Sequence, residues 1–139
     1  MIGEKMKAST QFSPETIANY RRAFYQRVQA QFHANEQRRQ QARQTVGEAI
    51  KTVIPHYPAV RRVYLFGSVT RAGAFGPDSD VDIGLEGANM SLCFDIWRDL
   101  ERAVPEWRLD VRSLDPEDLF AERVRQKGEL VYEQPTSDS

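Results

Sequence analysis

The residues best suited to chemistry are Asp80 and Asp82, which flank a single valine in the segment Asp-Val-Asp-Ile-Gly-Leu. Apolar residues at every second position predict a strand over 81–86, with Val81 and Ile83 facing a core. Both carboxylates then share the opposite face, about 7 Å apart along the strand. Two carboxylates this close repel each other unless a cation lies between them. Because hard carboxylate oxygens are the ligands that Mg2+ prefers, the pair predicts a magnesium site.

A third aspartate, Asp110, lies in a second predicted strand, over residues 107–114, between Leu109 and Val111. Since these two neighbours face the core, Asp110 faces outward. If this strand lies beside strand 81–86, its carboxylate joins the other two. Three carboxylates suit two metal ions, one activating the attacking oxygen and one steadying a triphosphate and its leaving group.

A predicted strand over residues 61–66 ends at Gly67-Ser68, where backbone amides and a hydroxyl can face an anion. Gly67 lets the backbone approach a phosphate closely. Arg71 follows one turn later and could donate to a phosphate with both arms of its guanidinium. With Ser79, which directly precedes the aspartate pair, these residues form the predicted nucleotide-binding set. By itself, a Gly-Ser turn or an Asp-x-Asp strand is weak evidence for a nucleotide-binding site. The prediction therefore depends on the order of these motifs along the chain.

That order resembles the polymerase-beta-type nucleotidyltransferases, and in particular their minimal branch, called MNT. The resemblance spans about residues 55–133. It is carried by two motifs and a similar ending, Leu65-Phe66-Gly67-Ser68-Val69-Thr70-Arg71, Asp78-Ser79-Asp80-Val81-Asp82-Ile83 and Gly128-Glu129-Leu130-Val131-Tyr132-Glu133.

The resemblance implies a magnesium-dependent enzyme that transfers AMP from ATP to a hydroxyl. Ser68 would contact the phosphates, and Asp80, Asp82 and Asp110 would bind two Mg2+ ions, with Asp110 aiding the nucleophile. Many MNT proteins are antitoxins of a HEPN ribonuclease toxin, and some AMPylate a toxin tyrosine. The implied function is therefore a protein adenylyltransferase and antitoxin, with a HEPN-type toxin as partner.

The chain departs from the family pattern in the loop after the Gly-Ser turn. Eleven residues separate Ser68 from Asp80, one more than the common antitoxin spacing. The family's Ala-Arg-Gly is here Thr70-Arg71-Ala72-Gly73, consistent with one inserted residue. The difference bears on the placement of Arg71 more than on that of the aspartates.

Upstream of this domain the sequence predicts a long helix. Ser13-Pro14-Glu15 is a typical helix start, and Pro55 and Pro58 stop the helix. An unbroken helix from Pro14 to Ile54 would be about 60 Å long, so it either projects from a small domain or breaks near 33–36. Its apolar face would need a partner or a second copy to cover it. That face consists of Ile17, Tyr20, Phe24, Val28 and Phe32.

The predicted fold is α/β, a small mixed sheet of three or four strands backed by helices. The remaining predicted elements are a helix over 92–104, a helix from Asp115 to about Lys127 that Gly128 stops, and a short strand over 130–132. We divide the chain into a helical arm over 1–55, a nucleotidyltransferase domain over 56–134 and a disordered tail over 135–139.

The composition bears on whether the chain spans a membrane, is secreted or forms a disulfide. There is no apolar run of about 18 residues, so no membrane span is expected, and Met1 to Thr10 lacks the apolar core of a signal peptide. A lone Cys93, interpreted as a core residue, excludes an internal disulfide and suits the cytoplasm.

Charge is divided unevenly. Residues 1–62 carry 11 Lys and Arg against 4 Asp and Glu, whereas residues 63–139 carry 8 against 16. The basic arm suits an acidic partner, self-association or nucleic acid, or it is a solvated helix; nucleic acid is the less favoured partner.

Two alternatives to the implied function remain. One is a non-catalytic antitoxin that acts by binding its partner, and the other is a nucleotidyltransferase that modifies small molecules.

Overall fold

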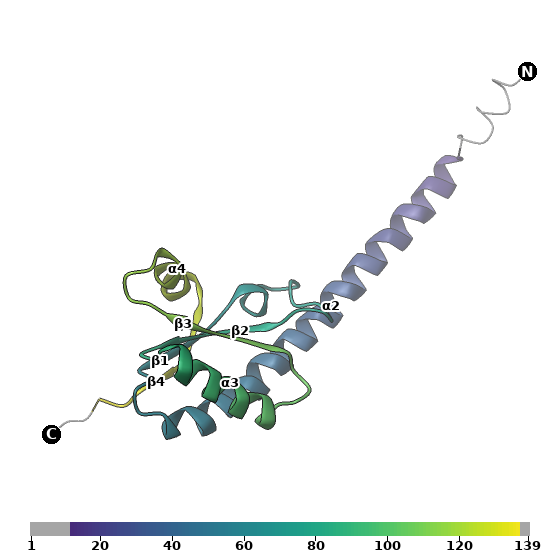
Figure 1. The fold of residues 1–139 in the computed structure, drawn as a ribbon. Helices are drawn as coiled ribbons and strands as arrows, with labels where there is room; N and C mark the ends of the chain where they lie inside the picture. The colour runs from purple at the N-terminus through teal and green to yellow at the C-terminus, as the bar shows by residue number, and fades with distance from the viewer. Residues whose placement is uncertain (1–11, 137–139) are drawn as a thin grey trace, which may run out of the picture.

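A computed structural model describes residues 12–136 of the chain. It shows a four-stranded sheet with helices on both faces and one long helix that extends away from it (Figure 1). The predictions for Met1 to Thr10 and for the last residues of the tail lie outside the described residues. The α/β prediction, with a mixed sheet backed by helices, is confirmed.

Helix α2 (Pro14–Val53) begins where predicted, since the Ser13 side chain accepts a hydrogen bond from the Thr16 amide at 3.1 Å. The helix does not break, and its 40 residues make it about 60 Å long. Its C-terminal part packs under the sheet with Ala42, Val46 and Ile50 fully buried. Every residue from 17 to 34 is exposed, so the N-terminal part projects beyond the domain (Figure 1). The short 3-10 helix η1 (Ile54–His56) follows the C-terminal end of α2.

The sheet has the order β3-β2-β1-β4. Its strands are β1 (Arg62–Phe66), β2 (Val81–Glu86), β3 (Leu109–Leu114) and β4 (Glu129–Glu133). β1 runs antiparallel to β2 and β4, whereas β2 and β3 are parallel and are joined by helix α3 (Met90–Ala103). The end of β1 therefore lies beside the start of β2, which brings the Gly-Ser turn to the aspartate pair.

One face of the sheet carries the main core, covered by α2 and α3. Cys93 is buried in it, as predicted, and Trp97 and Trp107 pack against it. The strand residues in this core sit at alternate positions: Val63, Leu65, Val81, Ile83, Leu85, Leu109 and Val111.

The opposite face carries a smaller cluster beneath helix α4 (Leu119–Lys127). Tyr64, Leu114, Ala121 and Val124 form it. Because this cluster is small, it leaves the Asp82 and Asp110 side chains only half-buried.

The predicted helix cap at Asp115 is wrong by three residues. Asp115 instead closes a turn, since its side chain accepts from the Glu117 amide at 3.0 Å and its carbonyl accepts from the Asp118 amide at 3.1 Å. Asp118 is the residue that caps the helix, accepting from the Phe120 amide at 3.0 Å. An Asp can satisfy amides in a turn as well as at a helix start, so the sequence pattern fits both.

Gly128 ends α4 as predicted, but with a φ of −78° rather than in the left-handed region. Glycine is needed there because a Cβ would lie 2.5 Å from the Val124 carbonyl oxygen and 2.8 Å from that of Leu65. Close backbone packing, rather than helix-capping geometry, accounts for this residue.

Candidate active site

The parallel pairing of β2 and β3 places Asp82 directly opposite Asp110 in register. Asp80 lies one residue before β2 and is exposed. The pKa of Asp82 is raised to about 6, first because the carboxyl is desolvated and then because the charges of Asp110 and Asp80 act on it. The three predicted aspartates therefore occupy one acidic cluster at one end of the sheet.

Two arginines on the same side of the sheet pair with the outer members of this acidic cluster. The Arg112 guanidinium lies 3.2 Å from Asp110 Oδ2 and 5.7 Å from the centre of the Phe120 ring. Arg108 Nε lies 3.5 Å from Asp80 Oδ1. Both arginines belong to the β3 segment, and strand alternation places them on the face that Asp110 occupies.

Gly67 joins the Gly-Ser turn to the acidic cluster. Its φ is +73°, and a Cβ there would lie 2.3 Å from Asp82 Oδ2. Only glycine fits both the backbone conformation and this approach. Residues Gly67–Thr70 form the 3-10 helix η2, in which Thr70 Oγ1 donates to the Gly67 carbonyl at 2.7 Å. The half-buried Ser68 thus stands one residue from the glycine that touches Asp82.

The other two predicted nucleotide-binding residues lie in the loop that follows. Arg71 ends η2, where its amide donates to the Ser68 carbonyl at 3.1 Å, and its side chain is exposed. Ser79 Oγ accepts from the Gly76 amide at 3.0 Å and closes the turn before the aspartates. The geometry thus gives Ser79 a local structural contact and leaves the Arg71 side chain facing solvent.

Three polar residues of α2 that no sequence motif indicated contact η2 and this loop: Asn35, Glu36 and Arg39. They fall in a polar stretch of the helix that contributes nothing to the apolar pattern. The one available signal was the spacing of Glu36 and Arg39, which are three residues apart and so share a helix face.

The donor chemistry of the cluster fits Mg2+. Three carboxylates supply hard oxygen ligands, and a cation would relieve the repulsion that adds to burial in raising the pKa of Asp82. Among residues 12–136, no group of three or more Asp, Glu, His or Cys side chains has a geometry that could hold a metal ion. Asp80 and Asp110 are instead paired with Arg108 and Arg112.

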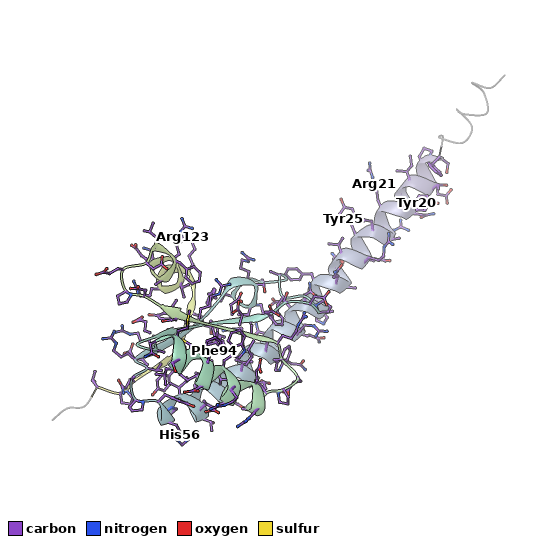
Figure 2. The ribbon with its side chains drawn as sticks, viewed as in Figure 1. Tyr20, Arg21, Tyr25, His56, Phe94 and Arg123 are labelled. Carbon is purple, nitrogen blue, oxygen red and sulfur yellow. The ribbon has the colours of Figure 1, made fainter. Side chains whose placement is uncertain are left out.

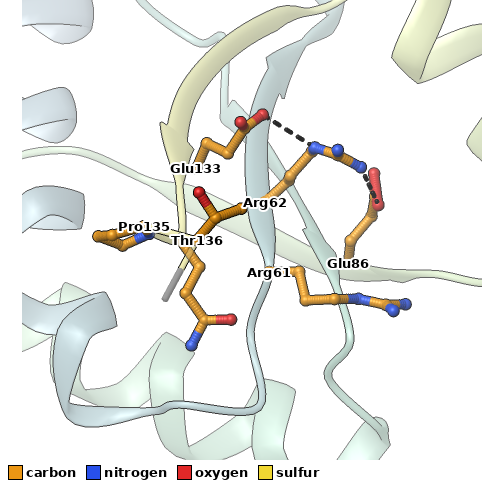
Figure 3. Close-up of a pocket in the computed structure, with 7 residues that line it drawn as sticks. Arg61, Arg62, Glu86, Glu133, Pro135 and Thr136 are labelled. Carbon is orange, nitrogen blue, oxygen red and sulfur yellow. Dashed lines mark hydrogen bonds and ion pairs between the residues drawn. The ribbon is translucent and has the colours of Figure 1, made fainter. Parts of the chain in front are cut away.

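A hollow of about 560 Å³ lies at the opposite end of the β1–β2 ladder (Figure 3). Arg62 crosses it, with Nη1 3.4 Å from Glu86 and Nε 3.0 Å from Glu133. Because Arg62 pairs with Glu86 in the ladder and Phe66 pairs with Asp82, the hollow is separate from the acidic cluster.

The sequence profile of the family described as "Polymerase beta, Nucleotidyltransferase" matches residues 48–137. The chain belongs to this family. No curated protein matches it significantly.

Among solved structures, a toxin–antitoxin crystallised with AMP-PNP is similar, at 20% identity and a TM-score of 0.53. The similarity covers 63% of this chain and 73% of that one. A mutant of the toxin–antitoxin MntA–HpeT shares 18% identity, with the same coverage and a TM-score of 0.53. At these identities the likeness establishes a shared fold.

None of the helices within residues 12–136 has both the length and the apolar character needed to cross a bilayer.

Proposed function

We propose that this nucleotidyltransferase-family chain is a magnesium-dependent protein adenylyltransferase that transfers AMP from ATP to a tyrosine hydroxyl of a HEPN-type ribonuclease toxin, and so acts as an antitoxin. The observation that carries the proposal is the contact between the Gly-Ser turn and the acidic cluster. Gly67 stands against Asp82, and Asp82 stands opposite Asp110. The resemblance to MNT antitoxins and the fold shared with toxin–antitoxin proteins support the partner.

In this proposal Asp80, Asp82 and Asp110 would hold two Mg2+ ions, which when bound would neutralise charge on the triphosphate and lower the pKa of the acceptor hydroxyl. The amides of η2 and the Ser68 hydroxyl bind phosphate oxygens, with Arg71 as a further donor.

The acceptor oxygen attacks the α-phosphorus, the bond from that phosphorus to the bridging oxygen breaks, and pyrophosphate leaves. The proton of the acceptor hydroxyl passes to the Asp110 carboxylate. Arg112, 3.2 Å from Asp110, holds this carboxylate in place beside Asp82.

A second candidate, a non-catalytic antitoxin that acts by binding, is favoured by the exposed apolar row on α2. Tyr20 is 61% exposed, Phe24 57% and Phe32 50%, and the row continues through Ile17 and Val28. Tyr20 and Tyr25 stand clear of the domain on the projecting helix (Figure 2). A monomeric soluble protein rarely leaves such a row uncovered, so a toxin or a second copy of the chain is its expected occupant.

Incubation with α-labelled ATP, Mg2+ and a purified HEPN-type toxin tests the proposal. Wild type should label the toxin, and the double variant Asp80→Ala/Asp82→Ala should not. Asp78→Ala is the matched control, because Asp78 is an exposed acid two residues away. Equal labelling by the double variant, or none by wild type, would reject catalysis. Neutralisation of the toxin by the double variant without label would favour the binding-only candidate.

A further inference from the structure

One turn of α2 holds the loop that follows the Gly-Ser turn. Asn35 Nδ2 donates to the Gly73 carbonyl at 3.0 Å, and the Gly73 amide donates to Glu36 Oε1 at 2.9 Å. Consecutive helix residues thus bind both polar backbone groups of one loop residue. Because the α2 backbone is rigid here, Gly73 is fixed relative to the helix.

Arg39 extends this contact to the Gly-Ser turn itself. Its guanidinium binds both Glu36 oxygens, at 2.6 and 3.0 Å, and its Nη1 donates to the Val69 carbonyl inside η2 at 3.3 Å. The Arg39 side chain is only 13% exposed and that of Glu36 only 25% exposed. Hydrogen bonds from Arg39 and then from the Gly73 amide lower the pKa of Glu36 to about 2. The pair is therefore ionised at neutral pH.

Phe32 adds an apolar contact to the same loop. Gly73 has a φ of +74°, and a Cβ there would lie 2.2 Å from the Phe32 ring. Buried side chains anchor the loop at its two ends, Val69 at 0% exposure and Phe75 at 1%. The middle of the loop, where Arg71 lies, depends on the helix for its position.

We infer that Asn35, Glu36 and Arg39 form a brace that positions the nucleotide-binding turn for its phosphate contacts. This inference rests on the proposed function. The three residues precede the family match, which begins at residue 48. They contact η2 at Val69 and the connection from η2 to β2 at Gly73. A loop has many conformations to restrict, and the brace supplies the fixed partners that restrict them.

The same helix offers a matched control for the brace. One turn after Arg39, Arg43 Nε donates to Glu129 Oε2 at 2.8 Å and ties α2 to β4. This ion pair is also two-pronged and partly buried, but within residues 12–136 the hydrogen-bond partners of the Arg43 side chain are Glu129 and Gln40 alone. Arg43→Gln therefore removes a comparable ion pair without touching the loop.

The experiment compares full-length wild type with Glu36→Gln, Arg39→Gln, Arg39→Lys and Arg43→Gln. It uses hydrogen exchange of residues 67–76, binding of Mg2+–AMP-PNP, and the KM and kcat of AMP transfer. Because Arg39→Gln removes the charged donor that binds Glu36 and the Val69 carbonyl, it should speed loop exchange by about tenfold or more. It should weaken AMP-PNP binding and raise the KM for ATP by about five- to tenfold, with kcat changed less than about threefold.

The two remaining arginine variants separate positioning from helix stability. Arg39→Lys keeps the positive charge but loses the planar, two-pronged guanidinium. It should therefore retain part of the AMP-PNP affinity that Arg39→Gln loses. Arg43→Gln should leave loop exchange and AMP-PNP affinity within about twofold of wild type.

Three outcomes would overturn the brace. These are unchanged loop exchange in Glu36→Gln and Arg39→Gln, equal loosening of the loop in Arg43→Gln, or faster exchange with unaltered AMP-PNP affinity. If wild type binds no AMP-PNP, the proposed function fails and the positioning role fails with it. Hydrogen exchange would still show in that case whether the contacts hold the loop, so the two failures are distinguishable.

Discussion

The two faces of the sheet use the same strands for different purposes. Toward α2 and α3, β2 presents Val81, Ile83 and Leu85, all at 0% exposure. Toward the α4 side, the same strand presents Asp82 and the buried Glu86. Because side chains alternate along a strand, one hexapeptide serves both a closed apolar core and an acidic cluster. Substitutions on one face should therefore change folding, and those on the other should change chemistry.

The acidic face carries a cost in stability. Partial burial of the Asp82 carboxyl, and then the charges of Asp110 and Asp80, raise its pKa to about 6. A carboxylate held beside two others opposes folding at neutral pH. The core face must supply the stability that offsets this repulsion.

The largest expected effect is on the acidic face. Asp82→Asn or Asp110→Asn should lower AMP transfer by about a thousandfold or more, because each removes a proposed ligand of the metal pair. Circular dichroism should show an unchanged fold, since neither side chain belongs to the apolar core. Transfer within about tenfold of wild type in either variant would contradict the assignment.

On the core face, Ile83→Ala should destabilise the protein by about 3 kcal/mol, through lost apolar burial and a cavity. Ile83 is fully buried one residue after Asp82. Urea unfolding measures the loss, and transfer per folded molecule should stay near that of wild type. A loss of unfolding free energy below about 1 kcal/mol, or a loss of AMP transfer in the folded protein, would show that the core face and the acidic face do not have separate roles.

At the junction of turn and cluster, Gly67→Ala should cost about 1–2 kcal/mol and weaken AMP-PNP binding. The added Cβ would meet Asp82 Oδ2 at 2.3 Å, and the backbone φ is +73°. Gly76→Ala is the matched control, because no atom lies within 4 Å of a Cβ placed there. If the two variants behave alike in thermal melts and AMP-PNP titrations, the close approach of Gly67 to Asp82 affects neither stability nor nucleotide binding.

The smallest effect concerns pH in the metal-free protein. The pKa of Asp82 is about 6 in the folded chain against an ordinary value of 3.8, so the folded state binds the proton more tightly than the unfolded state. Stability contributed by this group should therefore rise as pH falls from 7.5 to 5, by on the order of 1 kcal/mol after allowance for solvent screening.

Asp82→Asn should remove this pH-dependent rise and should be the more stable protein at neutral pH. Urea unfolding of both proteins at the two pH values measures the difference. Glu36, whose folded pKa is about 2, loses its contribution only at lower pH, from about its ordinary 4.5 downward. Parallel pH dependence in wild type and Asp82→Asn would show that Asp82 is not the group responsible.

Much of the fold follows from local sequence patterns. Alternation predicted β2 at its observed bounds, Val81–Glu86, and put Asp82 on the face opposite Ile83. Ser13-Pro14 marked the start of α2. The order of the motifs also predicts the site residues, and that assignment stays a prediction for the variants above to test. Local patterns did not decide whether α2 breaks, and they misplaced the start of α4, because Asp115 suits a turn as well as a cap.

The sequence by itself determined the strand faces, the helix start at Ser13 and the identity of the acidic residues, because neighbours within a few positions encode them. Only the tertiary structure decided that Gly67 touches Asp82 and that Glu36 and Arg39 hold Gly73 and Val69. These contacts join residues 15 to 37 positions apart. Their formation depends on how β1 pairs with β2 and how α2 crosses the loop, and no short sequence pattern records either.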